Sequence, residues 1–390
     1  MKKRLSIMAA VMIAALNITA CSGTTAASTD AKTEEVKTEA VKTEAAKSES
    51  GKPESPAAAD KESSTTKAAS GEYSADTAET VITYNETCAE DHSMSRAAVY
   101  FRDLVAEATE GRIWIDLYFS GTLGGEASCM EGLQIGTIDM YRGNMSTLPD
   151  YGVSITNAVC LPYLFSDISE LHSVLTSDVG NGLLQSIEDA GVGYVGLGYM
   201  EEGPRNLFLT EKAVKSLDLS NGLKLNDMAG LKVRVPETQS LIDAITALGA
   251  SPTTIAYSEL YTSLQTGVVD AAENGISGYV VNSFYEVAPY YVKDAHTFGP
   301  GVTLISEACW SKLSPEDQQI MKEAAAKTTE YAYELAVESE NELYEKLPEM
   351  GVTVVEVEDI SQWQEAVKDM YADSGEEIYS IVQEIQNMKK

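Results

Sequence analysis

Apolar residues between positions 81 and 141 recur at two spacings in turn, one typical of strands and one typical of helices. The strand-like stretches are apolar at every second position, whereas Ser93 to Glu110 has the three- and four-residue spacing of a helix that Gly111 ends. The predicted elements are a strand at 81–84, a helix at 93–110, a strand at 113–119, a helix at 126–135 and a strand at 138–141. This βαβαβ order predicts half of an open α/β lobe. Such lobes bind ligands at the carboxyl ends of their strands, which here include Tyr84-Asn85-Glu86, Ser120-Gly121 and Arg142-Gly143-Asn144.

A second α/β unit is predicted between Leu225 and Asn274. In the run Leu231-Lys232-Val233-Arg234-Val235, apolar and basic residues alternate with the period of a half-buried strand. The pattern then predicts a helix at 241–248, a strand at 253–256, a helix at 258–264 and a strand opening at 268–270. The alternation places Arg234 on the polar face of its strand, which by itself favours a solvated arginine.

A long helix is predicted to begin at Ser314. This serine can cap the helix, Pro315 suits its first turn, and the acidic pair Glu316-Asp317 is favoured by the helix dipole. The helical pattern continues to Lys346, and a helix of roughly 32 residues is about 48 Å long. One small lobe is shorter than that. The remaining residues, 352–390, are predicted to add a strand and helices.

The first 20 residues have the pattern of a targeting segment. A basic start, Lys2-Lys3-Arg4, precedes an apolar stretch that is too short to cross a bilayer as a mature helix. The run Ile18-Thr19-Ala20-Cys21 resembles a bacterial lipobox, so we expect a signal peptide at 1–20 and a lipidated Cys21; the alternative is an ordinary signal peptide with an incidental cysteine. Residues 21–78 are rich in Ala, Thr, Ser, Lys and Glu, which predicts a disordered tether.

Charge and cysteine content narrow the possible partners. The chain has 60 acidic and 28 basic residues, a formal net charge of −32. Such a surface repels phosphate backbones, so we expect no nucleic-acid partner. The four cysteines after Cys21 are Cys88, Cys129, Cys160 and Cys309. They have no CxxC spacing, so no zinc site is predicted, while both disulfides and free buried thiols remain open.

No catalytic or nucleotide-binding motif is found in a suitable context. The three histidines, His92, His172 and His296, lie in unrelated stretches, and neither a GxSxG elbow nor an HExxH helix occurs. Residues 191–196 match GxGxxG, but a predicted helix precedes them and an apolar strand follows, whereas a dinucleotide fold needs strand, turn and helix. We therefore expect a protein without enzymatic activity, cofactor or metal.

Several runs resemble those of the solute-binding proteins of TRAP (tripartite ATP-independent periplasmic) transporters. They are SGTLGGEASCMEGLQIGTIDM at 120–140, LPYLF at 161–165 and the whole segment 225–274. The resemblance spans nearly everything from residue 80 to about 345 and implies an α/β, two-lobed periplasmic-binding-protein-like fold with a long helix spanning both lobes. The implied boundaries are 79–202 plus 300–340 for lobe I and 203–299 plus 341–390 for lobe II.

The resemblance also implies ligand-binding residues. Arg234 falls on the strand arginine that clamps a carboxylate in that family, and Arg205 falls on its second arginine, although the gap of 29 residues is wider than the usual one of about 20. The other implied contacts are Asn274, the cleft-lining Tyr257 and Glu126, which ends the LGGE run. Read without the resemblance, these are a surface-turn arginine, a turn asparagine, a core tyrosine and one acid among many. The chain departs from the family pattern at Ala271, where glycine is usual, and at Gly275, where proline is usual; no basic residue follows the LGGE run, which argues against a third cationic contact.

The expected function is capture of a small organic acid by its carboxylate and its delivery to TRAP membrane permease subunits. The protein would be an extracytoplasmic monomer, anchored to the cell membrane as a lipoprotein. C4-dicarboxylates, hexuronates, sialic acid and other monocarboxylates remain open as ligands. The alternatives are a binding lipoprotein of an ABC importer, a ligand-binding subunit of a sensor and, from a different class, a secreted hydrolase.

Overall fold

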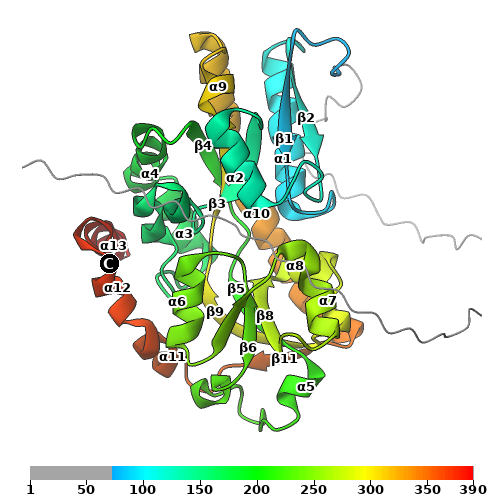
Figure 1. Cartoon of the computed structure of the whole chain (residues 1–390), viewed down its shortest axis with the longest axis vertical. Helices are drawn as coiled ribbons and strands as arrows, with labels where there is room; N and C mark the ends of the chain where they lie inside the picture. Colours follow the sequence, from blue (N-terminus) through cyan, green and yellow to red (C-terminus); the bar gives the residue numbers. More distant parts are fainter. Residues whose placement is uncertain (1–72, 390) are drawn as a thin grey trace, which may run out of the picture. The chain divides into compact units, whose positions relative to one another are not determined.

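The computed structural model describes residues 73–389, which belong to one compact unit of the chain. The predicted signal peptide, the lipidation at Cys21 and all but the last few residues of the predicted tether lie outside the described residues. Two β-sheets organise the described part, and helices cover both of them (Figure 1).

The first sheet has five strands in the order β2-β1-β3-β10-β4. Their bounds are Thr80–Asn85 for β1, Ile113–Tyr118 for β2, Met140–Asn144 for β3, Tyr194–Met200 for β4 and Gly301–Ser306 for β10. Strand β1 pairs in parallel with β2 and β3, whereas β10 is antiparallel to β3 and β4. The strand predicted at 138–141 is found at Met140–Asn144. It extends beyond the prediction because its last residues pair with β10, more than 150 residues away in sequence.

The second sheet has six strands in the order β11-β9-β5-β8-β6-β7. Their bounds are Arg205–Leu209 for β5, Lys232–Val235 for β6, Ser251–Thr254 for β7, Ala271–Gly275 for β8, Tyr290–Thr297 for β9 and Thr353–Glu356 for β11. Strand β6 is parallel to its neighbours β7 and β8, so all three carboxyl ends point the same way. Strand β5 is antiparallel to β8, and its first residue lies opposite the last residue of β8.

Along the chain, the helices and strands occur in the predicted order. Their bounds are α1 Ser93–Ala108, α2 Glu126–Ile135, α3 Ile168–Leu175, α4 Asp178–Asp189, α5 Glu211–Val214, α6 Gln239–Ala247, α7 Leu260–Gln265, α8 Ile276–Val281, α9 Glu307–Trp310, α10 Pro315–Lys346, α11 Ile360–Val367, α12 Asp369–Asp373 and α13 Glu376–Met388. Short 3-10 turns add η1 Leu148–Tyr151, η2 Ser154–Val159, η3 Leu225–Met228, η4 Tyr257–Glu259, η5 Phe284–Glu286 and η6 Leu347–Met350. None of the helices in residues 73–389 is long and apolar enough to cross a membrane.

Three segments connect the two sheets. Residues 201–204 join β4 to β5, residues 298–300 join β9 to β10, and α10 contacts β4 and α1 on the side of the first sheet and α8 on the side of the second (Figure 1). The Ser314 side chain accepts the N–H of Asp317, so the predicted cap and the predicted long helix are both confirmed; α10 has 32 residues. The chain thus has the expected two-lobed α/β fold, with each sheet built from separate parts of the sequence.

The C-terminal helix α13 packs differently from the prediction. Residues 341–390 were all assigned to the second lobe, and α11 does pack there, with Trp363 in the core of the second sheet. Helix α13 instead contacts η2, and its Val382 and Ile385 belong to the core that includes Leu171 and Tyr194 on the side of the first sheet. The apolar stripe of a helix predicts that the helix packs against other elements, but it does not indicate which lobe those elements belong to.

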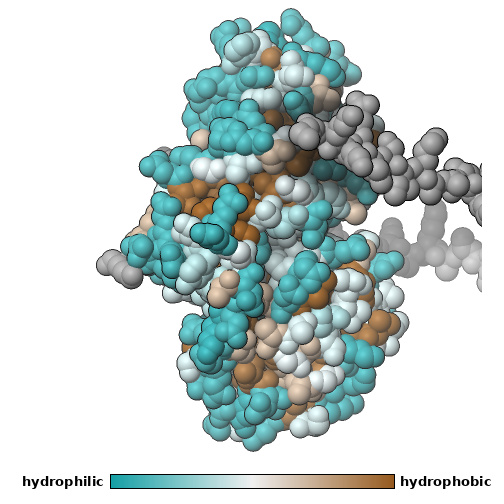
Figure 2. All heavy atoms as spheres, turned by 60° about the vertical axis from the view of Figure 1, so that its left-hand side comes forward, coloured by the Kyte–Doolittle hydropathy of each residue, from teal (hydrophilic) through white to brown (hydrophobic). Residues whose placement is uncertain are grey.

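The surface is largely hydrophilic (Figure 2), as the acidic composition suggests, and the cysteines among the described residues are unpaired. Figure 2 shows one face on which hydrophilic residues predominate and apolar residues gather near the middle of the view. Cys88, Cys129, Cys160 and Cys309 are all buried and free, which settles the open alternative in favour of free thiols. On so acidic a chain, a site for an anion needs its own local positive charge.

Candidate functional site

Arg234 is a buried guanidinium without a carboxylate partner. It lies on β6, between β7 and β8, and its exposed fraction is 2%. Its Nε donates to the carbonyl oxygen of Ile255 at 2.8 Å, and its guanidinium carbon lies 5.8 Å from the centre of the Tyr257 ring. Among residues 73–389 it forms no ion pair, and burial lowers its pKa to about 10. It therefore stays charged at neutral pH, and an unpaired buried charge favours the arrival of an anion.

Arg205, the first residue of β5, is already neutralised. Its Nε lies 2.6 Å from Oε2 of Glu273 on β8, and its Nη2 lies 2.9 Å from Oε1 of the same carboxylate. Its Nη1 faces a second carboxylate, that of Glu202, at 4.0 Å. Burial alone would raise the pKa of Glu273, but the charges of Arg205 and His296 hold it well below its usual range. Arg205 can therefore offer a ligand only its Nη1 edge.

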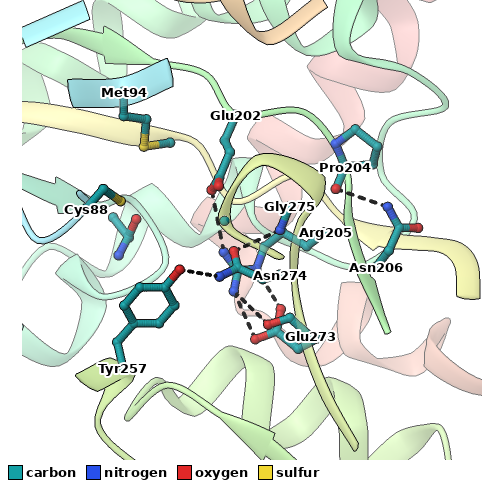
Figure 3. Close-up of polar contacts among 12 residues, drawn as sticks. Cys88, Met94, Glu202, Pro204, Arg205, Asn206, Tyr257, Glu273, Asn274 and Gly275 are labelled. Carbon is teal, nitrogen blue, oxygen red and sulfur yellow. Dashed lines mark hydrogen bonds and ion pairs between the residues drawn. The ribbon is translucent and has the colours of Figure 1, made fainter. Parts of the chain in front are cut away.

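Tyr257, whose ring faces Arg234, and Asn274, the residue before the strand partner of Arg205, form one hydrogen-bonded group. The amide nitrogens of Asn274 and Asn282 donate to the Tyr257 hydroxyl at 3.1 and 2.9 Å. The Asn274 side-chain oxygen accepts the N–H of Gly275 at 2.8 Å. Because the hydroxyl oxygen of Tyr257 accepts two bonds, its hydrogen is left to donate elsewhere. Burial raises the pKa of Tyr257, so it stays a neutral donor. Figure 3 shows its contact with Asn274.

Glu126 lies in the helix layer of the first sheet, and its charge acts on Arg234. It is the first residue of α2, and its Oε1 accepts from Asn144 and Thr147, each at 2.9 Å. Its negative charge acts on Arg234 and partly offsets the lowering of that pKa. The structure therefore brings Arg234, Arg205, Asn274 and Tyr257 together, with Glu126 as an acceptor on the side of the first sheet.

The sequence did not assign a role to Arg142, a third buried guanidinium, on β3. Its Nη2 lies 2.7 Å from Oε1 of Glu86, its Nε lies 3.0 Å from Oε2 of the same side chain, and its Nη1 donates to Asn144 at 2.9 Å. Glu86 follows β1 and Arg142 lies on β3, and both positions are among the strand ends expected from the sequence to bind ligands. Their pairing could not be predicted, because it depends on β1 and β3 lying side by side.

His296 also contacts this group of charges, although in the sequence it is only one of three histidines in unrelated stretches. It is fully buried; its Nδ1 lies 2.8 Å from Asp294 and its Nε2 lies 3.5 Å from Glu273. Burial would lower its pKa, but these two carboxylates raise it to about 9. A chain of alternating charges thus runs from Asp294 through His296 and Glu273 to Arg205.

The site as a whole is arranged to hold an anion. Two of its three guanidinium groups are paired with glutamates, and Arg234 is left facing Tyr257. No group of three or more His, Cys, Asp or Glu residues in the described part of the chain has the geometry of a metal site. The arrangement can bind a carboxylate through charge-assisted hydrogen bonds and offers further polar groups to the rest of a small ligand.

Comparison with known proteins shows which family and which solved structures this chain is similar to. The model of the family described as "Bacterial extracellular solute-binding protein, family 7" matches residues 84–378. A solute-binding protein from Roseobacter denitrificans is 34% identical over 298 residues, which cover 76% of this chain and 87% of that protein. A solved TRAP periplasmic solute-binding protein from Bradyrhizobium, in complex with galacturonate, is 31% identical with a TM-score of 0.73, covering 78% of this chain and 99% of the other. Another, from Roseobacter denitrificans with bound L-galactonate, is 31% identical with a TM-score of 0.71, covering 79% and 99%.

Proposed function

Because this chain belongs to the bacterial extracellular solute-binding proteins of family 7, we propose that it captures a small organic acid outside the cytoplasm and delivers it to a TRAP membrane permease. The observation that carries this proposal is Arg234, a charged guanidinium that is buried and unpaired among the described residues. The bound ligands of two similar proteins, galacturonate and L-galactonate, are small carboxylates.

The geometry around Arg234 explains how a carboxylate would be held. The bond from Nε to the Ile255 carbonyl oxygen fixes the plane of the guanidinium and leaves the Nη1 and Nη2 edge free. That edge can donate two parallel bonds to the two oxygens of a carboxylate. The Tyr257 hydroxyl and the Nη1 edge of Arg205 can donate from neighbouring directions. Both Arg234 and its carboxylate would be desolvated, which strengthens the pair.

A thermal-shift screen tests the proposal. We expect organic acids to stabilise the protein and their neutral analogues, in which the carboxylate is reduced to an alcohol, to leave it unchanged. A ligand at 100 times its dissociation constant should add about 2.7 kcal/mol to the free energy of unfolding. Stabilisation by neutral sugars, but by no acid in a broad set, would contradict the proposal.

The proposal includes a lipid anchor at Cys21, supported by the lipobox-like run that precedes it. We expect Cys21→Ser to move the protein from the membrane fraction to the soluble extracytoplasmic fraction, because the serine cannot be lipidated. Binding of the organic acid by the purified protein should not change. Cys88→Ser is the matched control, since it removes a buried thiol of the folded domain, and its membrane fractionation should equal that of the parent. Equal fractionation of all three proteins would show that Cys21 is not the anchor.

A further inference from the structure

Glu202 is a carboxylate that the segment between β4 and β5 places at the edge of the site. Its side chain is 8% exposed, and its Oε1 lies 3.1 Å from Nε2 of His92, the residue that caps α1. Nδ1 of His92 accepts the N–H of Met94, so the ring hydrogen of His92 lies on Nε2 and is donated to Glu202. Glu202 is therefore held in place by a residue of the first sheet's helix layer.

The other oxygen of Glu202 faces Arg205. Its Oε2 lies 4.0 Å from Nη1 of Arg205, which is the edge that Glu273 leaves free. The guanidinium of Arg205 thus faces two carboxylates, those of Glu273 and Glu202. Burial alone would raise the pKa of Glu202, but the hydrogen bond from His92 holds that pKa below its ordinary value. Glu202 therefore stays negatively charged at neutral pH, and the charges of His92, Arg205 and Arg142 act on it.

Gly275 makes room for this carboxylate. A Cβ atom at position 275 would lie 2.9 Å from Cδ of Glu202, which is too close for a carbon contact. The glycine at the end of β8, where proline is usual in the resembling family, thus leaves space for the Glu202 carboxylate, and a larger residue there would require that carboxylate to shift. Figure 3 shows Glu202 directed at Arg205, next to Gly275 and Asn274.

Glu202 and Arg234 act on the same small space. The guanidinium carbon of Arg234 lies 5.8 Å from the centre of the Tyr257 ring. The Tyr257 hydroxyl accepts from Asn274, whose chain neighbour Gly275 lies against Glu202. A ligand whose carboxylate lies on Arg234 would extend along Asn274 toward Glu202, an oxygen group that, when ionised, accepts hydrogen bonds and donates none. A hydroxyl group can satisfy it, whereas a second carboxylate would repel it.

We propose that Glu202 makes the site selective for monocarboxylates with a hydroxylated far end and excludes the corresponding dicarboxylates. This inference rests on the proposed capture of an organic acid at Arg234. It adds that the negative charge of Glu202, which His92 holds in place beside Gly275, favours ligands with one carboxylate over ligands with two. Like charges placed close together in a partly desolvated site cost binding free energy.

Two pairs of acids that differ only at the far end test the proposal by titration calorimetry: L-galactonate against galactarate, and D-erythronate against meso-tartrate. In each pair the second acid has a carboxylate where the first has a terminal hydroxymethyl group. Where the parent protein binds the acids of a pair, it should bind the monoacid more tightly than the diacid. Glu202→Gln keeps the bond with His92 but removes the charge, so the preference for the monoacid should fall roughly 10- to 100-fold, through a gain by the diacid.

Glu201→Gln is the matched control. It changes the neighbouring residue of the same linker, but the side chain of Glu201 is directed at His172 on α3, 2.7 Å away, so the preference should be that of the parent. A parent that binds the diacid more tightly, or a Glu202→Gln variant whose preference stays within about threefold of the parent, would overturn the role of Glu202 while leaving capture at Arg234 standing. If the parent binds no acid of either pair and none in the thermal-shift screen, the proposed function and this inference both fail.

Discussion

Replacement of Arg234 by alanine is expected to weaken binding of the organic acid by roughly 30- to several-thousand-fold, because a desolvated carboxylate loses its charged partner at a cost of about 2–5 kcal/mol. Arg234→Lys should recover only part of this loss, since an ammonium group cannot donate two parallel bonds in a plane. Titration calorimetry with the tightest acid from the thermal-shift screen measures both effects.

The stability of this variant distinguishes a binding arginine from a structural one. Arg234 has no ion-pair partner among residues 73–389, so its removal leaves no buried carboxylate unpaired. We expect Arg234→Ala to unfold at the same denaturant concentration as the parent or higher, measured without ligand. Arg102→Ala, which removes an arginine of α1 outside the site, is the control for binding and should leave the affinity unchanged. Binding by Arg234→Ala within about threefold of the parent would remove Arg234 from the account.

Replacement of Glu273 by glutamine is expected to destabilise the fold strongly. The Glu273 carboxylate lies 2.6 Å from Arg205 and 3.5 Å from His296, and all three side chains are buried or nearly so. Without its charge, two cationic groups face each other in the interior, and breaking a buried pair of this kind costs roughly 3–5 kcal/mol. Denaturant unfolding of the ligand-free protein measures the loss.

Glu259→Gln is the control for this experiment, because it removes an exposed acid from the same sheet's helix layer and should change the free energy of unfolding by less than about 0.5 kcal/mol. A Glu273→Gln variant as stable as this control would mean that Arg205 and His296 are not held by Glu273. The two variants of Arg234 and Glu273 therefore have opposite expected signatures: one loses binding and keeps stability, and the other loses stability first.

The sequence predicts the elements of the fold well where the signal is local. The helix α1 and the strands β1 and β2 have the expected periods, and α10 begins at the expected cap and has the expected length. The limits appear where an element depends on distant partners. Strand β3 extends beyond its apolar pattern because it pairs with β10, and α13 packs on η2 although it follows the elements of the other lobe.

In the site, too, the sequence predicts what depends on neighbouring residues but not what depends on residues far apart in the chain. Alternation along β6 indicated a polar, solvated face for Arg234, but β6 lies between β7 and β8 in the interior of the sheet, and the arginine is buried there. Only the resemblance to a known family suggested a ligand contact. Periodicity cannot show that Arg205 is neutralised by Glu273, 68 residues away, or that Arg142 is neutralised by Glu86. These pairings leave Arg234 as an arginine of the site without an ion-pair partner among residues 73–389.

Gly275 illustrates a departure that only the structure explains. The sequence marks it as unusual for the family it resembles, but gives no reason. In the structure a side chain at this position would require the Glu202 carboxylate to shift from its place beside Arg205. A departure from a family pattern can therefore indicate a change of ligand preference when the residue that fills the space is charged.

The central claim is that Arg234 is the group that binds the ligand's carboxylate, and a crystal structure with the tightest acid from the thermal-shift screen tests it most directly. The account predicts that the two carboxylate oxygens lie within roughly 3.2 Å of Nη1 and Nη2 of Arg234, while Nε keeps its bond to Ile255 and Arg205 keeps its pair with Glu273. A ligand whose carboxylate lies on Arg142 or displaces Glu273 from Arg205, with Arg234 untouched, would contradict it.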